Sequence, residues 1–309
     1  MNDRDVRHEI GLGDGGYPDC IKELQPPPAV IYVRGDLDVL RTPCAAVIGS
    51  RRATPYGIAT AQIIAAALAQ SGITVVSGGA RGCDQAAGWS ALGAGGKHVI
   101  VLGTGADIVY PRSAAPLIER TIDAGGAIVS IERWGTGPRK YAFPKRNRVI
   151  AALSRVLFIT EADLPSGTFS TAEAAVALDR EVLAVPGSIM SPLSRGTNHL
   201  IASGAGCLID EESIEVAVSR IFGTLRYCRA GESGPIEGVG QEAEIMRALF
   251  ASPLRMDEIA AMLSVGVMDC LPVVSALEMR KRIERLPDGR YAPTARSLRE
   301  RSTIVDSAP

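Results

Sequence analysis

Basic side chains are concentrated between Arg133 and Arg155, in a chain whose charges otherwise nearly cancel. This segment contains no acidic residue, whereas the whole sequence has 33 Lys+Arg and 34 Asp+Glu. A local positive field in a near-neutral protein attracts phosphate groups, although a solvated surface run is the alternative. Its centre, Phe143 to Arg148, adds an aromatic ring and several hydrogen-bond donors. The basic residues of the segment are Arg133, Arg139, Lys140, Lys145, Arg146, Arg148 and Arg155.

A second basic loop, with the sequence GSRRAT, follows an apolar run that ends at Ile48. Gly49 lets the backbone approach a ligand closely, and Ser50 and Thr54 offer hydroxyl groups. The helix expected directly after the loop would present free N–H groups to an anion. We therefore predict a phosphate-binding loop that includes Arg51 and Arg52.

Further glycine-bearing loops follow the other apolar runs. They contain Arg81, the sequence Ser166-Gly167-Thr168, Gly187 and Asn198. In an open parallel sheet, the loops at the carboxyl ends of the strands share one edge, where ligands bind. Any one loop can be merely a turn, but five at one edge predict a phosphate-lined cleft. The sequence lacks GxxxxGK[ST], and no GxGxxG follows the first strand, so a Walker A loop and a dinucleotide site are excluded.

Short apolar runs alternate with longer alanine-rich segments from Cys44 to about Gly223. The alternation predicts an α/β fold, a doubly wound Rossmann-like parallel sheet covered by helices on both faces. A helix is expected from Tyr56 to Gln70, with Gly72 as its stop signal. A further short strand is expected at Ala29 to Val33. The other predicted strands are Ala45–Ile48, Ile73–Val76, His98–Leu102, Ala127–Ile131, Val156–Thr160 and Glu181–Val185.

The domain organisation follows from shifts in composition. An N-terminal segment, residues 1–43, precedes the Rossmann-like domain at 44–223. Residues 224–241 are rich in Gly, Ser, Glu and Pro and are expected to be a linker. A small winged-helix-like domain is predicted at 242–294. Its signals are helical stripes at 242–250, 256–263 and 267–283, followed by a turn at Asp288-Gly289. The polar tail, 295–309, is expected to be disordered.

Composition narrows the class of protein. No run of 18 apolar residues is present, and the charged N-terminus lacks a secretory core, so a cytoplasmic protein without a membrane segment is expected. The six cysteines are scattered without a CxxC pair, and there are three histidines. We therefore expect reduced, mostly buried thiols, no metal site and no cofactor.

The ordered motifs of residues 17–222 resemble those of the DNA-processing protein A family, also called DprA or Smf. The resemblance implies single-stranded DNA binding during natural transformation, a homodimer, loading of the RecA recombinase onto DNA, and no accepted catalytic activity. The C-terminal region is similar to the winged-helix-like domain of many members. The motifs are GSRRATPYG (49–57), SGGARGCD (77–84), Tyr110-Pro111, FPKRNRVIAALS (143–154), SGT (166–168) and GTNHLIASGA (196–205).

The resemblance also implies roles for individual residues. Arg51 and Arg52 match the basic loop that contacts DNA phosphate, and Lys140 matches a DNA-contacting lysine. Phe143 is similar to the aromatic residue placed against a base. The chain departs from the family pattern in SGGARGCD, where SGLARGID is usual, and in SGTFSTA, where SGSLITA is usual. A separate N-terminal helical domain, which is found in many relatives, is expected to be missing or reduced to residues 1–43.

The residues predicted to bind DNA or phosphate share basic, hydroxyl, amide or glycine character at the expected carboxyl edge. Three of them have a structural alternative: Phe143 as a core residue, Arg148 paired with Glu161, and Arg81 paired with Asp84. The full set is Gly49, Ser50, Arg51, Arg52, Thr54, Arg81, Lys140, Phe143, Lys145, Arg146, Asn147, Arg148, Ser166, Gly167, Thr168, Gly187 and Asn198.

Two other functions compete with single-strand binding. A related Rossmann-like hydrolase would cleave the glycosidic bond of a nucleoside monophosphate with Glu161 or Glu173, but the PGGxGTxxE signature is absent. The winged helix could bind duplex DNA through residues 267–283, which end in Arg280, Lys281 and Arg282. Because Glu278 and Glu284 flank those cations, a partner-binding or dimerising role is an equal alternative.

Overall fold

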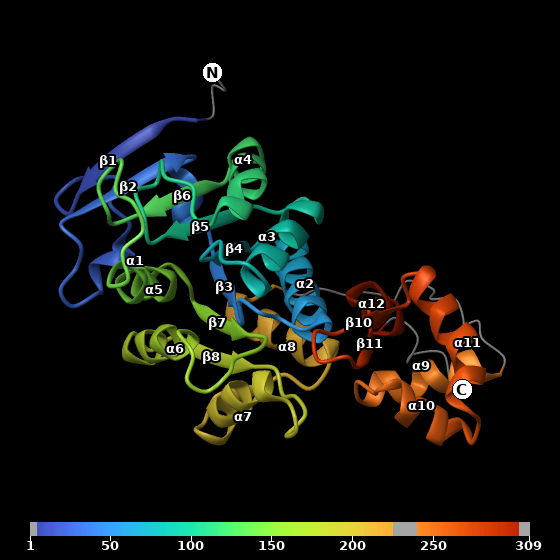
Figure 1. Ribbon diagram of the computed structural model, residues 1–309. Coiled ribbons are helices and arrows are strands. Elements are labelled where there is room, and N and C mark those ends of the chain that lie inside the picture. The colour runs from blue at the N-terminus through green and yellow to red at the C-terminus, as the bar shows by residue number, and fades with distance from the viewer. Residues whose placement is uncertain (1–4, 225–239, 303–309) are drawn as a thin grey trace. The chain divides into compact units, whose positions relative to one another are not determined.

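The computed structural model describes residues 5–224 and 240–302. The chain divides into two compact units, residues 1–226 and 227–309. Figure 1 shows an α/β unit in the first and a small, mainly helical unit in the second.

A nine-stranded sheet in the order β1-β2-β6-β5-β4-β3-β7-β8-β9 forms the centre of the first unit. Strands β3 to β9 run parallel to one another, so the predicted doubly wound parallel sheet is confirmed. Strands β3 to β8 are buried on both faces, and this burial explains their nearly continuous apolar sequences, whereas the short edge strand β9 is partly exposed. The parallel strands are β3 (Cys44–Ile48), β4 (Thr74–Ser77), β5 (His98–Leu102), β6 (Ala127–Ser130), β7 (Val156–Ile159), β8 (Glu181–Ala184) and β9 (Gly206–Cys207).

Helices cover both faces of the sheet, as Figure 1 shows. Alternation along β3 sends Ala45 and Val47 to one face, and Ala46 and Ile48 to the other. The first face is covered by α2 (Pro55–Gln70), α3 (Cys83–Gly93), α4 (Ala115–Asp123) and α8 (Glu211–Phe222). The second is covered by α1 (Asp19–Lys22), α5 (Ala142–Leu153) and α6 (Thr168–Ala177), and Leu200 of α7 (Arg195–Ala202) packs there. Short 3-10 turns, η2 (Arg112–Ala114) and η3 (Pro192–Ser194), precede α4 and α7.

The N-terminal segment is part of this sheet. Strand β1 (Arg7–Gly11) pairs antiparallel with β2 (Val30–Gly35), and β2 pairs antiparallel with β6. The predicted strand at Ala29 to Val33 is therefore β2, shifted toward the C-terminus. Residues before Cys44 do not form a separate unit, because the domain predicted to start at residue 44 includes their two strands.

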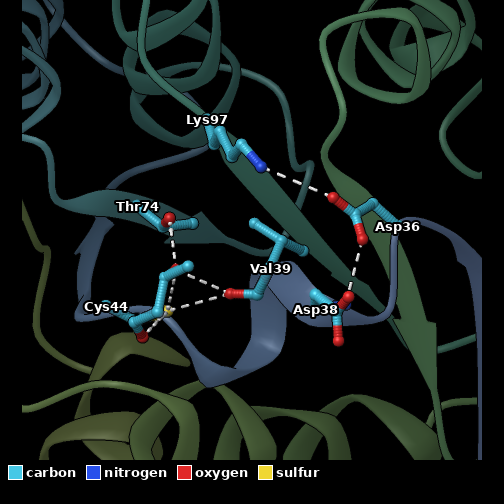
Figure 2. A network of polar contacts seen from close by, with 7 residues as sticks. Asp36, Asp38, Val39, Cys44, Thr74 and Lys97 are labelled. Carbon is cyan, nitrogen blue, oxygen red and sulfur yellow. Dashed lines mark hydrogen bonds and ion pairs between the residues drawn. The ribbon is translucent and has the colours of Figure 1, made fainter.

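A polar network fixes the connection from β2 to β3 through the turn η1 (Asp38–Arg41), as Figure 2 shows. The Thr42 hydroxyl donates to the Val39 carbonyl at 2.7 Å and lies 2.7 Å from the Thr74 hydroxyl. The Lys97 ammonium pairs with Asp36 at 3.4 Å. The Thr42–Thr74 contact joins the amino ends of β3 and β4, and the Lys97–Asp36 pair joins the residue before β5 to the residue after β2. Both lie away from the loops predicted to bind phosphate.

The described part of the second unit contains the three helices and the hairpin that were predicted, and a fourth helix that was not. The predicted elements are α9 (Gln241–Ala251), α10 (Met256–Leu263), α11 (Val267–Met279), and strands β10 (Ile283–Arg285) and β11 (Tyr291–Pro293). Its core is separate from that of the sheet and includes Ile245, Leu249, Ile259, Val274 and Leu277. Each unit thus has its own hydrophobic core.

Two predictions for the C-terminal region are wrong. Helix α11 ends at Met279 rather than Ile283, because Lys281 adopts a left-handed φ of 55° and Ile283 begins β10. The tail predicted to be disordered forms α12 (Ala295–Ser302), where the Thr294 hydroxyl accepts a hydrogen bond from Ser297 N at 3.3 Å. Residues 303–309 and most of the predicted linker, 225–239, lie outside the described residues.

Within residues 5–224 and 240–302, no helix alone is long and apolar enough to cross a bilayer. Helices α10 and α11 meet that criterion only together, as a pair bent by 111°.

Candidate nucleic-acid interface

The predicted phosphate loops lie at one edge of the sheet. Strands β4, β3, β7 and β8 are consecutive and parallel, so the loops after them emerge side by side. Backbone hydrogen bonds join these loops: Cys83 N donates to Ser50 O at 3.2 Å, and Gly196 N donates to Ala162 O at 2.8 Å. The convergence expected from the sequence is therefore present.

Phe143 lies in the first turn of α5, partly buried beside the basic loop after β3. The Arg51 guanidinium carbon lies 5.5 Å from its ring centroid, and the Tyr110 ring lies 5.8 Å away between centroids. A Cβ at Gly103 would lie 3.0 Å from the Phe143 ring, so a glycine there permits the close contact. Phe143 is thus a half-open aromatic surface next to a cation, not a fully buried core residue.

A second aromatic and cationic cluster surrounds Tyr141, a residue outside the predicted set. The Tyr141 side chain is 51% exposed. Arg139 Nη1 donates to its hydroxyl at 2.8 Å, and Lys145 Nζ lies 5.1 Å from its ring centroid. The sequence signal was an aromatic residue one position after Lys140. Such a ring offers a face on which a base can stack.

Five predicted cations are exposed and belong to no ion pair within the described part of the chain. Arg81 is one of them, so the alternative pairing of Arg81 with Asp84 is wrong. The Asp84 carboxylate instead accepts from Gly78 N at 2.9 Å and from Ala80 N at 3.4 Å. These guanidinium and ammonium groups are available to a polyanion. They are Arg51, Arg52, Arg81, Lys140 and Lys145.

Arg146 does not belong to this exposed set, contrary to the prediction. Its side chain is only 5% exposed, and Nη1 donates to the carbonyls of Gly78 and Val101, both at 2.6 Å. Burial lowers the pKa of Arg146 to about 10, and the nearby Asp84 charge opposes that shift. Arg146 therefore ties α5 to the ends of β4 and β5, and its guanidinium cannot act as a free phosphate ligand.

Asn147 and Arg148 also have structural partners. The Asn147 amide donates to Gly167 O at 3.2 Å and to Ser170 Oγ at 2.8 Å, so it links α5 to the start of α6. Arg148 Nη2 donates to Gln25 O at 2.5 Å and makes no ion pair with Glu161, so that alternative is wrong. Both side chains remain partly exposed, so their role as DNA ligands stays a prediction.

Glu161 organises the loop after β3. Its buried carboxylate accepts from Thr54 N at 2.9 Å and from the Thr54 hydroxyl. A Cβ at Gly57 would lie 2.3 Å from Glu161 Oε2, so the glycine allows α2 to start this close. Burial raises the pKa of Glu161, and the hydrogen bonds from Thr54 oppose the rise. Thr54 thus caps α2 and anchors the loop that presents Arg51.

The remaining predicted residues shape the neighbouring loops. Ser166 Oγ accepts from Thr168 N at 3.2 Å, and the Thr168 side chain is buried. The Asn198 amide exchanges two hydrogen bonds with the Gly187 backbone, at 3.1 and 3.0 Å. The buried Thr168 is therefore a positioning residue, and Asn198 holds the Gly187 loop while remaining partly exposed. Gly49, Ser50, Ser166, Gly167 and Gly187 also keep some exposure along the edge.

The described residues contain no group of three or more His, Cys, Asp or Glu side chains able to hold a metal ion. The cysteines in that part of the chain are free thiols; Cys44, Cys83 and Cys270 are buried, Cys20 is partly buried and Cys207 is exposed.

Comparison with known proteins identifies two matching family models. Residues 8–219 match the model for DNA recombination-mediator protein A, and residues 233–289 match the DprA winged helix domain.

Two curated relatives illustrate the sequence similarity. The chain is 38% identical over 194 residues to the DNA processing protein DprA of Streptococcus pneumoniae, covering 62% of this chain and 67% of that protein. It is 38% identical over 207 residues to Protein Smf of Escherichia coli, covering 67% of this chain but only 55% of that protein.

Two solved structures are similar as well. The X-ray structure of DprA from Streptococcus pneumoniae gives a TM-score of 0.63 at 35% identity, covering 68% of this chain and 73% of that one. A structure of DNA processing protein A from Helicobacter pylori, described for its single-stranded DNA binding mode, gives a TM-score of 0.63 at 31% identity. That match covers 72% of this chain and 100% of the other.

Proposed function

The chain belongs to the DNA recombination-mediator protein A (DprA/Smf) family, and on that premise we propose that it binds single-stranded DNA without regard to base sequence. The observation that carries the proposal is the placement of Phe143, with the exposed Arg51 guanidinium 5.5 Å from its ring. A single strand needs a cationic track for its backbone and aromatic faces for its bases. The carboxyl edge of the sheet supplies both.

In the proposed complex, Arg51, Arg52 and Arg81 contact phosphates along the loops after β3 and β4. Lys140 contacts the backbone before α5, and a base stacks against Phe143 beside Tyr110. Contacts to phosphate carry no sequence information, so binding is tolerant of sequence and strongly dependent on salt. The N-terminal turn of α5 brings the aromatic ring and the basic segment to one place.

We further propose that the bound strand is handed to the RecA recombinase during transformation, by a homodimer of this chain. Membership of a recombination-mediator family supports this role. Sequence-tolerant binding suits it, because incoming DNA has no fixed sequence. No catalytic step is required of the protein. Glu161, one of the two carboxylates of the hydrolase alternative, is buried and accepts hydrogen bonds from Thr54, so it is not free to act as an acid or base.

The direct test is a gel-shift series with oligo(dT) and a duplex of equal length across a range of salt. We expect the single strand to bind more tightly, and its affinity to fall steeply as salt rises. As a control for hydrolase activity, the protein is incubated with a panel of nucleotides, and no free base is expected. Equal binding of duplex and single strand, or release of base, would contradict the proposal.

The C-terminal unit is not expected to supply most of the DNA affinity. Helix α11 contains no Lys or Arg, and its exposed side chains include Met268, Leu271 and Met279. Arg280, just after the helix, pairs with Glu242 at 3.0 Å. A helix of this kind lacks the donors that bind phosphate and read bases in duplex DNA.

Deleting residues 240–309 should therefore leave oligo(dT) affinity within about threefold of the full chain, a change below 1 kcal/mol. The first unit retains its own cores, so it is expected to fold alone. Fluorescence anisotropy measures the affinity, and circular dichroism checks the fold. If the truncated protein is folded but does not bind oligo(dT), the main DNA site lies in the second unit.

A further inference from the structure

Helix α5 presents two different faces at the candidate interface. Phe143, Arg146 and Asn147 share the face that meets the loops of the sheet and α6. Lys145, Arg148 and Val149 share the other, which borders a groove of about 380 Å³. The opposite wall and floor of that groove are mainly apolar, and include Leu24, Pro26, Pro27, Pro28, Tyr32 and Ile131.

The wall formed by the proline run is fixed in place before any ligand binds. Arg148 Nη2 donates to Gln25 O at 2.5 Å, and the Tyr17 hydroxyl donates to Pro28 O at 2.7 Å. Leu12 N donates to Ala29 O at 2.9 Å. Proline rings also restrict the backbone to one φ region. A pre-formed wall loses little conformational freedom on binding, so ligand contacts translate into affinity.

The groove is continuous with the candidate interface through Lys145. Its ammonium lies 5.1 Å from the centroid of the exposed Tyr141 ring, and its side chain also lines the groove. Lys145 and Arg148 face one acidic residue of the lining, Glu132, so the lining is net positive. Mainly apolar walls, a few polar groups and this volume are typical of a site for one small organic group.

We propose that the groove holds a base of the same single strand, next to the nucleotides bound at Phe143. This inference rests on the proposed function and extends its site. The backbone passes over Tyr141 and Lys145, where the ammonium contacts a phosphate. The following base enters between the proline run and Val149. The interface is then longer than the Phe143 surface alone, and it wraps the first turn of α5.

The test fills the groove without touching the exposed cations. Ala29 is exposed and lines the groove, and only its backbone makes the hydrogen bond from Leu12. In Ala29→Trp, we expect affinity for oligo(dT) of about 15 nucleotides to fall about fivefold or more, the effect of one lost base contact. Affinity for a strand of about 6 nucleotides, which occupies only the Phe143 surface, should be unchanged. Ala177→Trp, an exposed position at the end of α6, is the matched control and should change neither.

Glu132→Lys gives a result that misfolding cannot produce. It makes the groove more positive, so we expect tighter binding of the long strand and unchanged binding of the short one. The groove assignment is overturned if Ala29→Trp binds both lengths like the wild type, or weakens both equally. A third outcome also overturns it: Ala29→Trp abolishes binding of free thymidine monophosphate but leaves the affinity for the long strand unchanged. The groove would then bind a free nucleotide and not a base of the strand. If the wild-type protein binds neither strand, the proposed function itself is wrong. If only the groove assignment is wrong, the wild-type protein still binds both strands.

Discussion

Arg51→Glu is expected to lower the affinity for oligo(dT) at least tenfold, or about 1.4 kcal/mol, while the protein stays folded. The Arg51 side chain is exposed and has no acidic partner among the described residues, so the fold does not depend on its charge. Its guanidinium lies beside the Phe143 ring, where a phosphate next to a stacked base would lie. Reversing the charge removes an attraction and adds a repulsion. Lys140→Glu should act in the same direction for the same reason.

Arg155→Glu provides the matched control for that experiment. Arg155 is exposed and belongs to the same basic stretch of sequence, but it directly precedes β7, at the opposite edge of the sheet. Its guanidinium lies over Phe222 of α8, 5.9 Å from the ring centroid. We expect a small change in affinity for Arg155→Glu, measured by anisotropy at fixed salt. If both reversals weaken binding equally, net charge rather than the carboxyl edge governs the affinity.

Arg146→Ala is expected to reduce the free energy of unfolding of the first unit by about 3–5 kcal/mol. The substitution leaves the buried carbonyls of Gly78 and Val101 without their donor. It also removes the cation that offsets the buried Asp84 carboxylate, whose pKa burial raises. Both tryptophans of the chain, Trp89 and Trp134, lie in this unit, so tryptophan fluorescence in a urea titration follows its unfolding alone.

Two further variants make the stability result specific. Arg146→Lys keeps a cation that reaches part of the site, so it should be destabilised less than Arg146→Ala. Arg51→Ala removes an equally long side chain from the surface and should shift the urea midpoint very little. If Arg146→Ala is folded and normally stable but does not bind DNA, the structural role is wrong and Arg146 is a phosphate ligand.

The sequence predicted the centre of the sheet well because its strands are buried on both faces. The apolar run within His98–Leu102 is too short for a helix and lies between glycines, which together indicate a strand, and that strand has the predicted bounds. The apolar pattern did not predict the edge strands of the sheet or the last helix. Strand β1 reads Arg-His-Glu-Ile-Gly, with too little apolar character to predict a strand, and β9 has only two residues. Helix α12 was missed because its polar sequence carries no core pattern, although Thr294 supplies a cap.

The candidate site was predicted as a stretch of sequence, and a stretch of charge does not say which side chains face solvent. Arg146 follows Phe143 by three residues, so helical geometry turns both toward the sheet, where Gly78 and Val101 accept its donors. Lys145 is on the other side of the same helix and stays exposed. The contribution of Tyr141 depends on Arg139 and Lys145 meeting at its ring, a contact that spacing alone does not specify.

The two edge strands of the nine-stranded sheet, β1 and β9, limit how a second copy of the chain can associate with it. Strand β9, Gly206–Cys207, offers almost no backbone ladder to a neighbouring molecule, and β1 carries Arg7, His8 and Glu9 along its length. Short edge strands and charged edge strands both discourage cross-β aggregation. Extension of the sheet is therefore a poor way to join a second copy, and side-chain surfaces are the better one.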